Sequence, residues 1–233
     1  MAFELDGVPA SGLFASAEGA ERPLPGVLIA PTIRGRTAFE ENKAKALAEM
    51  GYAALVIDLY GAHTRDAGIE VWREGMNRLK GDRPTLQRFL LDWHQCLRDQ
   101  DEVDAGRTGA IGFCFGGLCV LDLVRTGVDI GGVASFHGLF DPPGNTSGNS
   151  SQAKVLALHG WDDPLATPEQ VLALATELTE LGADWQIHAY GNTLHAFTNP
   201  AAADASAGTV YNADADRRSW AAMTGFFAEL FPA

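Results

Sequence analysis

Residues 109–117 read GAIGFCFGG, an apolar run that ends in a cysteine framed by glycines. The five residues GFCFG (112–116) have the form Gly-x-nucleophile-x-Gly, in which a strand turns sharply into a helix and presents the central side chain. Glycines are needed two residues before and after the nucleophile because strand and helix pass close to each other there. The stretch therefore predicts a strand over 108–113, a helix over 116–125, and a nucleophilic Cys114 at the helix N-terminus, where unpaired N–H groups favour the thiolate.

Short apolar runs recur on both sides of this stretch, which is typical of strands buried on both faces of a sheet. Expected strands cover residues 27–30, 53–58, 132–136, 155–159 and 185–190. The first 20 residues predict an edge hairpin, in which residues 3–5 and 12–16 flank a turn at Asp6-Gly7.

Stretches with helical periodicity lie between these runs. From Pro84 onward the apolar residues of one face are Leu86, Phe89, Leu90, Trp93 and Leu97. The residues TPEQ (167–170) form a capping box with proline at the first helical position, and Gly182 ends that helix. Further helices are expected over 39–50, over 71–79 within an irregular segment, and at the end of the chain, where the buried residues are Trp220, Met223, Phe227 and Leu230.

Strands that alternate with helices predict an α/β fold, namely a doubly wound, mostly parallel sheet with helices on both faces and the N-terminal hairpin at an edge. The chain has no repeat, linker or break in composition, and residues 142–152 are a polar excursion within it. One domain over residues 1–233 is therefore expected. In such sheets the chemistry lies in the loops at the carboxyl ends of the strands.

Composition limits the partners and the location of the chain. Its 233 residues carry 17 basic and 30 acidic side chains, a net charge of −13, which argues against binding to nucleic acid or to an anionic membrane. No apolar run approaches the length of about 18 residues that spans a bilayer, and the first residues lack a signal peptide. A soluble, cytoplasmic protein is expected, in which the odd set of Cys96, Cys114 and Cys119 stays reduced.

A nucleophile of this kind needs a base and an acid that orients the base, in the chain order nucleophile, acid, base. His195, in GNTLHAF (191–197), follows the last expected strand and is the predicted base. His188 lies inside that strand, and His137 and His159 come too early in the chain. For these reasons none of the three is preferred.

The acid should follow the expected strand over 155–159, where the sequence is LHGWDDP (158–164). Asp163 completes the pattern Gly-x-x-Asp before Pro164 and is favoured. Asp162 remains the alternative, because two adjacent carboxylates stand at the same turn.

At this point the chain resembles the dienelactone hydrolase family, whose members have the α/β-hydrolase fold. The resemblance covers most of the chain and rests on GY (51–52), DLYG (58–61), GFCFGG (112–117), FHG (136–138), HG (159–160) and HAF (195–197). It implies that Cys114 is the nucleophile, His195 the base and Asp163 the orienting acid. It also implies an oxyanion hole formed by the backbone N–H groups of Ile33 and Phe115.

Two positions depart from the family pattern. Well-known members have a glutamate just before the first oxyanion-hole residue, where this chain has Thr32, and an arginine that binds substrate four residues after the base, where it has Asn199. Arg34 and Arg36 stand beside the oxyanion loop and are weak candidates for binding a substrate carboxylate instead of the missing arginine.

The expected reaction is acyl transfer from a small ester or lactone to Cys114, followed by hydrolysis of the thioester by water activated on His195. A thioesterase or small-amide hydrolase with the same residues is an alternative, and so is a non-catalytic scaffold whose Cys114 senses oxidants or binds a ligand. The sequence has no phosphate loop, dinucleotide fingerprint or zinc-ligand spacing, so no metal or cofactor is expected. A monomer or small homo-oligomer is expected.

Overall fold

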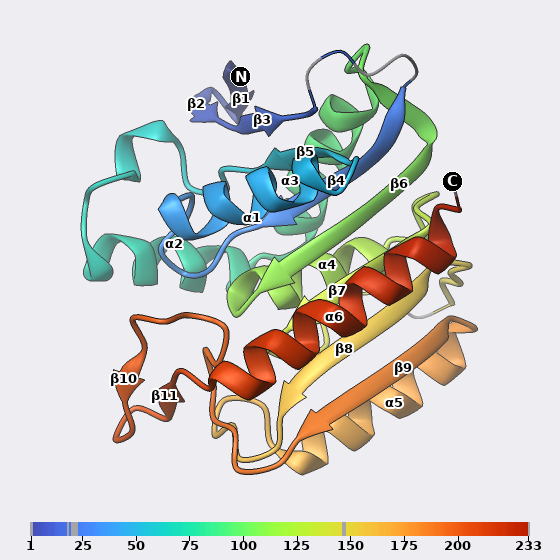
Figure 1. Ribbon diagram of the computed structural model, residues 1–233. Coiled ribbons are helices and arrows are strands. Elements are labelled where there is room, and N and C mark those ends of the chain that lie inside the picture. Colours follow the sequence, from blue (N-terminus) through green and yellow to red (C-terminus); the bar gives the residue numbers. More distant parts are fainter. Residues whose placement is uncertain (1, 18, 20–22, 146–147, 233) are drawn as a thin grey trace.

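The computed structural model describes residues 2–17, 19, 23–145 and 148–232. Its centre is a seven-stranded sheet in the order β3-β5-β4-β6-β7-β8-β9 (Figure 1). The strands are β3 (Leu13–Ala15), β4 (Leu24–Ala30), β5 (Ala53–Val56), β6 (Val103–Phe113), β7 (Gly132–Phe136), β8 (Lys154–Gly160) and β9 (Asp184–Tyr190). All neighbouring strands are parallel except β3, which pairs antiparallel with β5. The predicted α/β class and mostly parallel sheet are confirmed.

Helices cover both faces of this sheet. One face carries α1 (Ala38–Glu49) and α6 (Ala213–Leu230), and the other carries α3 (Arg83–Arg98), α4 (Phe115–Arg125) and α5 (Pro168–Leu181) (Figure 1). Alternate residues of β4 divide between the two cores: Val27 and Ile29 pack on the first side, Leu28 and Ala30 on the second. The helices α2 (Ile69–Gly81) and η1 (Ala62–Thr64) occupy the segment expected to be irregular.

Local sequence signals set several helix ends where the sequence predicts them. Thr167 and Gln170 form the expected capping box at the start of α5, and Gly182 ends it in the left-handed conformation at φ +78°. Asp82 caps α3, whose expected apolar face is fully buried. In α6 the structure buries Met223 and Phe227, as expected, and leaves Trp220 and Leu230 partly exposed.

The N-terminal hairpin forms with a different second strand. β1 (Ala2–Leu5) pairs with β2 (Val8–Ser11) across the predicted Asp6-Gly7 turn, as a separate two-stranded sheet. The expected partner, residues 12–16, instead supplies β3 at the edge of the main sheet. Gly12 separates the two strands at a point where a Cβ atom would lie 3.0 Å from the Trp93 ring and from the Val56 carbonyl oxygen. The described part of the polar excursion, residues 142–145 and 148–152, has no helix or strand; residues 146–147 lie outside the described residues.

A buried ionic network joins the three helices of one face. Asp122 of α4 is fully enclosed and accepts hydrogen bonds from Arg83 of α3, at 2.6 Å from Nε, and from Arg125, at 3.0 Å from Nη1. Arg125 is also fully enclosed and binds Glu177 of α5 through two bonds of 2.7 Å. The two positive and two negative charges balance, and the hydrogen bonds satisfy ions that would be costly to bury alone.

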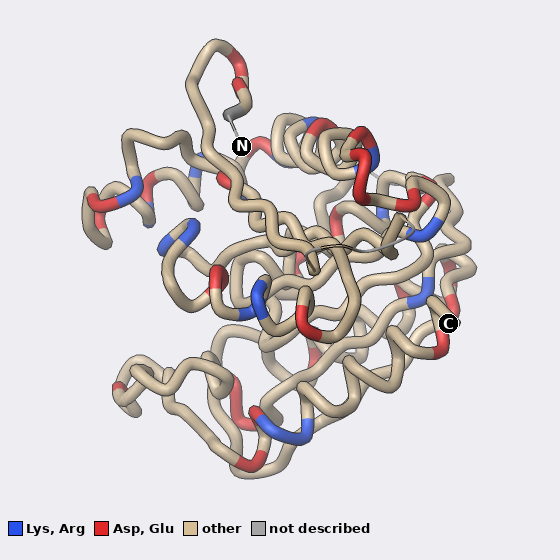
Figure 2. The backbone as a smooth tube through the Cα atoms, turned by 45° about the horizontal axis from the view of Figure 1, so that its top comes forward, with Lys and Arg blue, Asp and Glu red and all other residues tan. Residues whose placement is uncertain are grey.

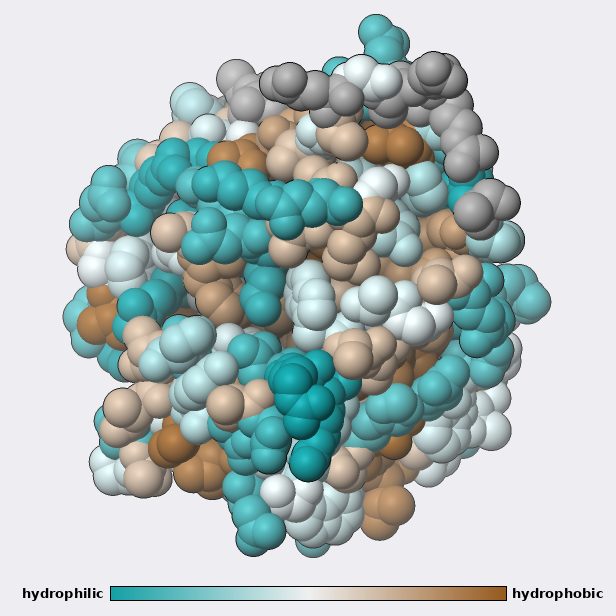
Figure 3. Space-filling view, viewed as in Figure 1, coloured by the Kyte–Doolittle hydropathy of each residue, from teal (hydrophilic) through white to brown (hydrophobic). Residues whose placement is uncertain are grey.

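Acidic and basic residues are interspersed along the backbone (Figure 2), and the face seen in Figure 3 shows apolar residues as separate patches among polar ones. Among the described residues, no helix is both long enough and apolar enough to cross a membrane. Figure 1 shows that β6, β8 and β9 point to one edge of the sheet, where the loop with β10 (Ala203–Asp204) and β11 (Thr209–Val210) also lies. The predicted functional residues follow the strands at this edge.

Candidate active site

Cys114 occupies a strained turn between β6 and α4. Its backbone lies at φ +57° and ψ −115°, a conformation that residues with a side chain rarely adopt. A Cβ atom on Gly112 would lie 1.9 Å from the Gly116 carbonyl oxygen, and one on Gly116 would lie 2.0 Å from the Ala30 carbonyl oxygen. The glycines on either side of Cys114 are therefore required by contact, as the sequence pattern predicts.

Asp163 and His195 meet at the next strand ends. The Asp163 Oδ2 atom lies 2.7 Å from His195 Nδ1, and both side chains are almost completely buried. Asp163 Oδ1 accepts a further hydrogen bond from the Leu165 N–H at 2.8 Å. The neighbouring Asp162 is exposed to solvent. Of the two carboxylates that the sequence leaves open, the structure brings only Asp163 to the imidazole.

The loop with β10 and β11 holds the His195 backbone in place. The His195 N–H donates to the Gly208 carbonyl at 2.9 Å, and its carbonyl accepts from the Val210 N–H at 3.1 Å. Gly208 packs so closely on Pro164 that a Cβ atom there would lie 2.2 Å from the proline ring. The same short segment thus fixes the histidine and the turn that carries Asp163. The sequence gives no period or turn signal for these two-residue strands, and they were not expected.

The Cys114 sulfur lies among groups that stabilise a negative charge. Burial by itself raises the pKa of this thiol, but the nearby His195 ring and the backbone N–H groups of Phe115 and Ile33 lower it further than burial raises it. Its pKa therefore lies below the ordinary value. Burial opposes the imidazolium of His195 as well, yet the Cys114 charge and the Asp163 hydrogen bond raise the pKa of His195 to about 10. Both shifts favour a thiolate beside an imidazolium over a neutral thiol beside a neutral imidazole.

Glu40 supports the loop that contributes the Ile33 N–H. Its carboxylate is completely buried at the start of α1, where one oxygen closes the capping box with Thr37. The other oxygen accepts a hydrogen bond from the Thr32 N–H at 3.1 Å. Thr32 stands where well-known dienelactone hydrolases have glutamate, according to the sequence resemblance. Its backbone N–H is therefore bound by the carboxylate of Glu40, eight residues further along the chain.

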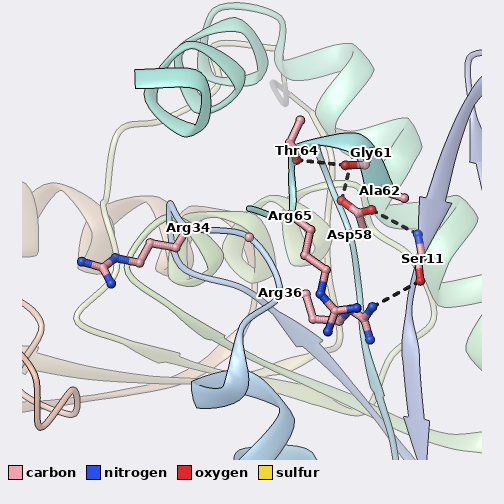
Figure 4. Close-up of a pocket in the computed structure, with 9 residues that line it drawn as sticks. Ser11, Arg34, Arg36, Asp58, Gly61, Ala62, Thr64 and Arg65 are labelled. Carbon is pink, nitrogen blue, oxygen red and sulfur yellow. Dashed lines mark hydrogen bonds between the residues drawn. The ribbon is translucent and has the colours of Figure 1, made fainter. Parts of the chain in front are cut away.

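The weak substrate-binding candidates lie in different surroundings. The Arg36 guanidinium binds the Ser11 hydroxyl at 3.2 Å and pairs with Glu41 at 3.4 Å, beside Arg65, whereas the exposed Arg34 extends away from them (Figure 4). The cavity at this cluster holds about 20 Å³, the room of roughly one water molecule. Asn199 closes its own turn by accepting a hydrogen bond from the Ala201 N–H at 3.0 Å.

A larger cavity of about 300 Å³ lies between the N-terminal hairpin, α2 and α3. Tyr60 forms part of its wall, and the Tyr60 ring stacks on Phe115, the residue after Cys114, with centroids 6.2 Å apart. The other lining residues include Leu5, Val8 and Phe89. Its volume is at the lower end of the range for small-molecule sites.

The remaining histidines differ in exposure. His188 is exposed to solvent on β9. His137 is buried, and its ring lies 5.1 Å from that of His195, between centroids. Chain order alone gave no reason to select His137; the only sequence signal is its place directly after an expected strand, in the FHG stretch. The described residues contain no cluster of histidine, cysteine, aspartate or glutamate that could hold a metal ion.

A model of the dienelactone hydrolase family matches residues 11–231. The chain belongs to this family. A solved structure named "m3DLH" is 35% identical and superposes with a TM-score of 0.91, covering 99% of this chain and 97% of that one. The dienelactone hydrolase-like promiscuous phosphotriesterase P91 from metagenomic libraries is 34% identical, with a TM-score of 0.89 over 99% of this chain and 96% of its own.

A further relative of this chain is the Caenorhabditis elegans protein K02A2.1. It is 36% identical over 152 residues, which are 64% of this chain and 94% of that protein. Together these matches confirm the predicted family and the α/β-hydrolase fold. They also identify the chain as a hydrolase of the class that acts on esters and lactones.

Because its pKa is lowered, Cys114 should react with iodoacetamide below pH ~8.5, the value of a free cysteine. The thiolate fraction rises as pH rises through the pKa, so the midpoint of the labelling rate, followed by mass spectrometry, measures that pKa. Thr32→Glu should move the midpoint upward, because a nearby carboxylate disfavours the thiolate, whereas the neutral Thr32→Gln should not. Negligible labelling of the unmodified protein below pH ~8.5 would contradict this expectation.

Proposed function

We propose that this dienelactone hydrolase family member hydrolyses small carboxylic esters or lactones with Cys114 as nucleophile, His195 as base and Asp163 as orienting acid. The observation that carries the proposal is the environment of the Cys114 sulfur, where the His195 ring and two backbone N–H groups favour a negative charge. The same two N–H groups would stabilise the oxyanion that forms next to the sulfur during acyl transfer.

In the first step the thiolate attacks the substrate carbonyl carbon, and a carbon–sulfur bond forms. The carbonyl oxygen becomes an oxyanion, which accepts hydrogen bonds from the N–H groups of Ile33 and Phe115. When the carbonyl re-forms, the bond to the alcohol oxygen breaks, and the His195 imidazolium gives its proton to the leaving oxygen. The product is a thioester on Cys114 and a free alcohol, or an attached hydroxyl when the substrate is a lactone.

In the second step water attacks the thioester carbon while His195 takes a proton from it. Acylation removes the negative charge of Cys114, which is one cause of the raised pKa of His195. The pKa of the ring therefore falls in the acyl-enzyme, and the ring stays in the unprotonated form that can take a proton from water. The carbon–sulfur bond then breaks, and the thiolate and imidazolium are restored. Asp163 keeps the imidazole in the tautomer that this exchange requires.

The cavity of about 300 Å³ beside Tyr60 has the size of a small-molecule site, and the Tyr60 ring stacks on Phe115, so it is our candidate for the place of a small substrate. A second candidate activity is hydrolysis of activated phosphotriesters, since the similar protein P91 is described as a promiscuous phosphotriesterase. The same thiolate would then attack phosphorus instead of carbon. Thioesters and small amides are further candidates that use the same residues.

The test is a panel of p-nitrophenyl acetate, a small lactone, an acyl thioester, an anilide and an aryl phosphotriester. Turnover should be fastest with the ester or lactone, and quenching during turnover of p-nitrophenyl acetate should leave an acetyl group on Cys114, detected by peptide mass spectrometry. Turnover with the acyl group on another residue would overturn the assignment of the nucleophile. Reaction of Cys114 without turnover of any panel member would favour the non-catalytic alternative.

A further inference from the structure

His137 makes a hydrogen bond with each of its two ring nitrogens, and each bond reaches a different part of the candidate site. Its Nδ1 atom lies 3.1 Å from the backbone nitrogen of Cys114. Its Nε2 atom lies 2.8 Å from the Thr198 hydroxyl, three residues after His195 in the same loop. Both His137 and Thr198 are almost completely buried. The ring therefore connects the nucleophile turn to the loop that carries the histidine base.

These two contacts fix the tautomer of His137. The Cys114 N–H can only donate, so Nδ1 must accept and carry no proton. The neutral ring then bears its proton on Nε2 and donates it to the Thr198 oxygen. Protonation of Nδ1 would place two N–H groups against each other, and the ring is accordingly kept neutral: burial, His195 and Lys43 all lower the pKa of His137 well below its usual value.

The Cys114 backbone needs such support because its conformation is strained. A residue with a side chain at positive φ is strained, and this conformation persists only where neighbouring groups hold it in place. The Cys114 N–H is shared between the Phe136 carbonyl oxygen, at 3.0 Å, and His137 Nδ1. The second acceptor restricts rotation of this peptide, on which the direction of the sulfur depends.

We propose that His137 is a positioning residue, which aligns the Cys114 sulfur with the His195 ring by accepting from the Cys114 N–H and donating to Thr198. The expected effect of His137 on turnover rests on the proposed function. The expected effect of His137 on the Cys114 thiolate does not, because the pH dependence of Cys114 alkylation can be measured without a substrate. The charged groups that influence the titration of His137 are His195 and Lys43.

Two substitutions separate the functions of the two ring nitrogens. In His137→Asn the amide oxygen can occupy the place of Nδ1 and still accept from Cys114, whereas in His137→Gln only the place of Nε2 can be filled. We expect His137→Gln to lower kcat about tenfold or more, the effect of one lost hydrogen bond, with little change in KM. Its alkylation midpoint should move upward, toward the ordinary thiol value. His137→Asn should restore most of kcat and of the midpoint.

Thr198 supplies an independent test at the other end of the contact. Thr198→Val removes the acceptor of the Nε2 proton and leaves the Nδ1 contact with Cys114, as His137→Asn does. It should therefore change kcat and the alkylation midpoint less than His137→Gln does, and Thr198→Ser should leave both unchanged. Melting temperatures show how far each variant is destabilised. Equal effects of His137→Asn and His137→Gln on the midpoint, or an unchanged midpoint in His137→Gln, would overturn the proposal. If the unmodified protein itself shows no turnover while its alkylation midpoint is lowered as expected, the proposed function is refuted instead.

Discussion

Replacing Cys114 with alanine should abolish ester hydrolysis, with a loss of roughly 10⁴-fold or more, and should leave the melting temperature nearly unchanged. Cys114 is the only nucleophile that the proposed mechanism provides, so nothing takes over its covalent step. The side chain is partly exposed, and its removal leaves no large hole in the core. Initial rates with p-nitrophenyl acetate, together with thermal melts of both proteins, measure the two quantities.

Cys119, five residues further along α4, provides the matched control. It is completely buried, and Cys119→Ala should lower the melting temperature through lost packing while turnover by the folded protein stays close to normal. The reverse pattern, in which Cys114→Ala remains active after purification from contaminating esterases, would show that the hydrolysis does not depend on this thiol.

Asp163→Asn should reduce kcat by roughly 10³- to 10⁴-fold, because the amide cannot replace the carboxylate at His195 Nδ1. The asparagine oxygen can keep the bond to the Leu165 N–H, so its amide nitrogen turns toward the imidazole and favours the wrong tautomer. The raised pKa of His195 should fall as well, since the Asp163 hydrogen bond is one of its causes.

Asp162→Asn is the control, since it changes an exposed carboxylate on the neighbouring residue and should alter kcat less than about twofold. The two variants carry the same change of charge, and only Asp163 contacts the imidazole. Rates measured from pH 5 to pH 9 separate an effect on tautomer from an effect on charge. Equal losses in both variants would remove Asp163 from the proposed role.

The sequence predicts those parts of the molecule whose causes are local. The turn at Cys114 is predictable because contacts to Gly112 and Gly116 act within a few residues of it. The helix ends at Thr167 and Gly182 follow for the same reason. Placing His195 and the Asp162-Asp163 pair at one edge needed only the order of the strands, because parallel strands bring their carboxyl ends to one edge. The contact that separates Asp163 from Asp162 is visible only in the structure.

The features that the sequence does not reveal depend on distant parts of the chain. The Glu40 carboxylate reads as an ordinary capping residue of a helix, and its bond to Thr32 exists only once the oxyanion loop has folded over α1. His137 was passed over because chain order does not show that it lies against Cys114. The second strand of the hairpin was misplaced because both Val8–Ser11 and the following residues have strand character, and only the structure shows that the two-residue turn selects the nearer one.

The enclosed charges between α3, α4 and α5 also bear on how the molecule opens. Lifting α5 away would separate Glu177 from Arg125 and leave a buried guanidinium with one anionic partner in place of two. Release of α5 is therefore coupled to release of α4, the helix that begins directly after Cys114. Their amide hydrogens should exchange as a single cooperative unit, and any partly unfolded form that has shed α5 will already have lost the reactive thiol's surroundings.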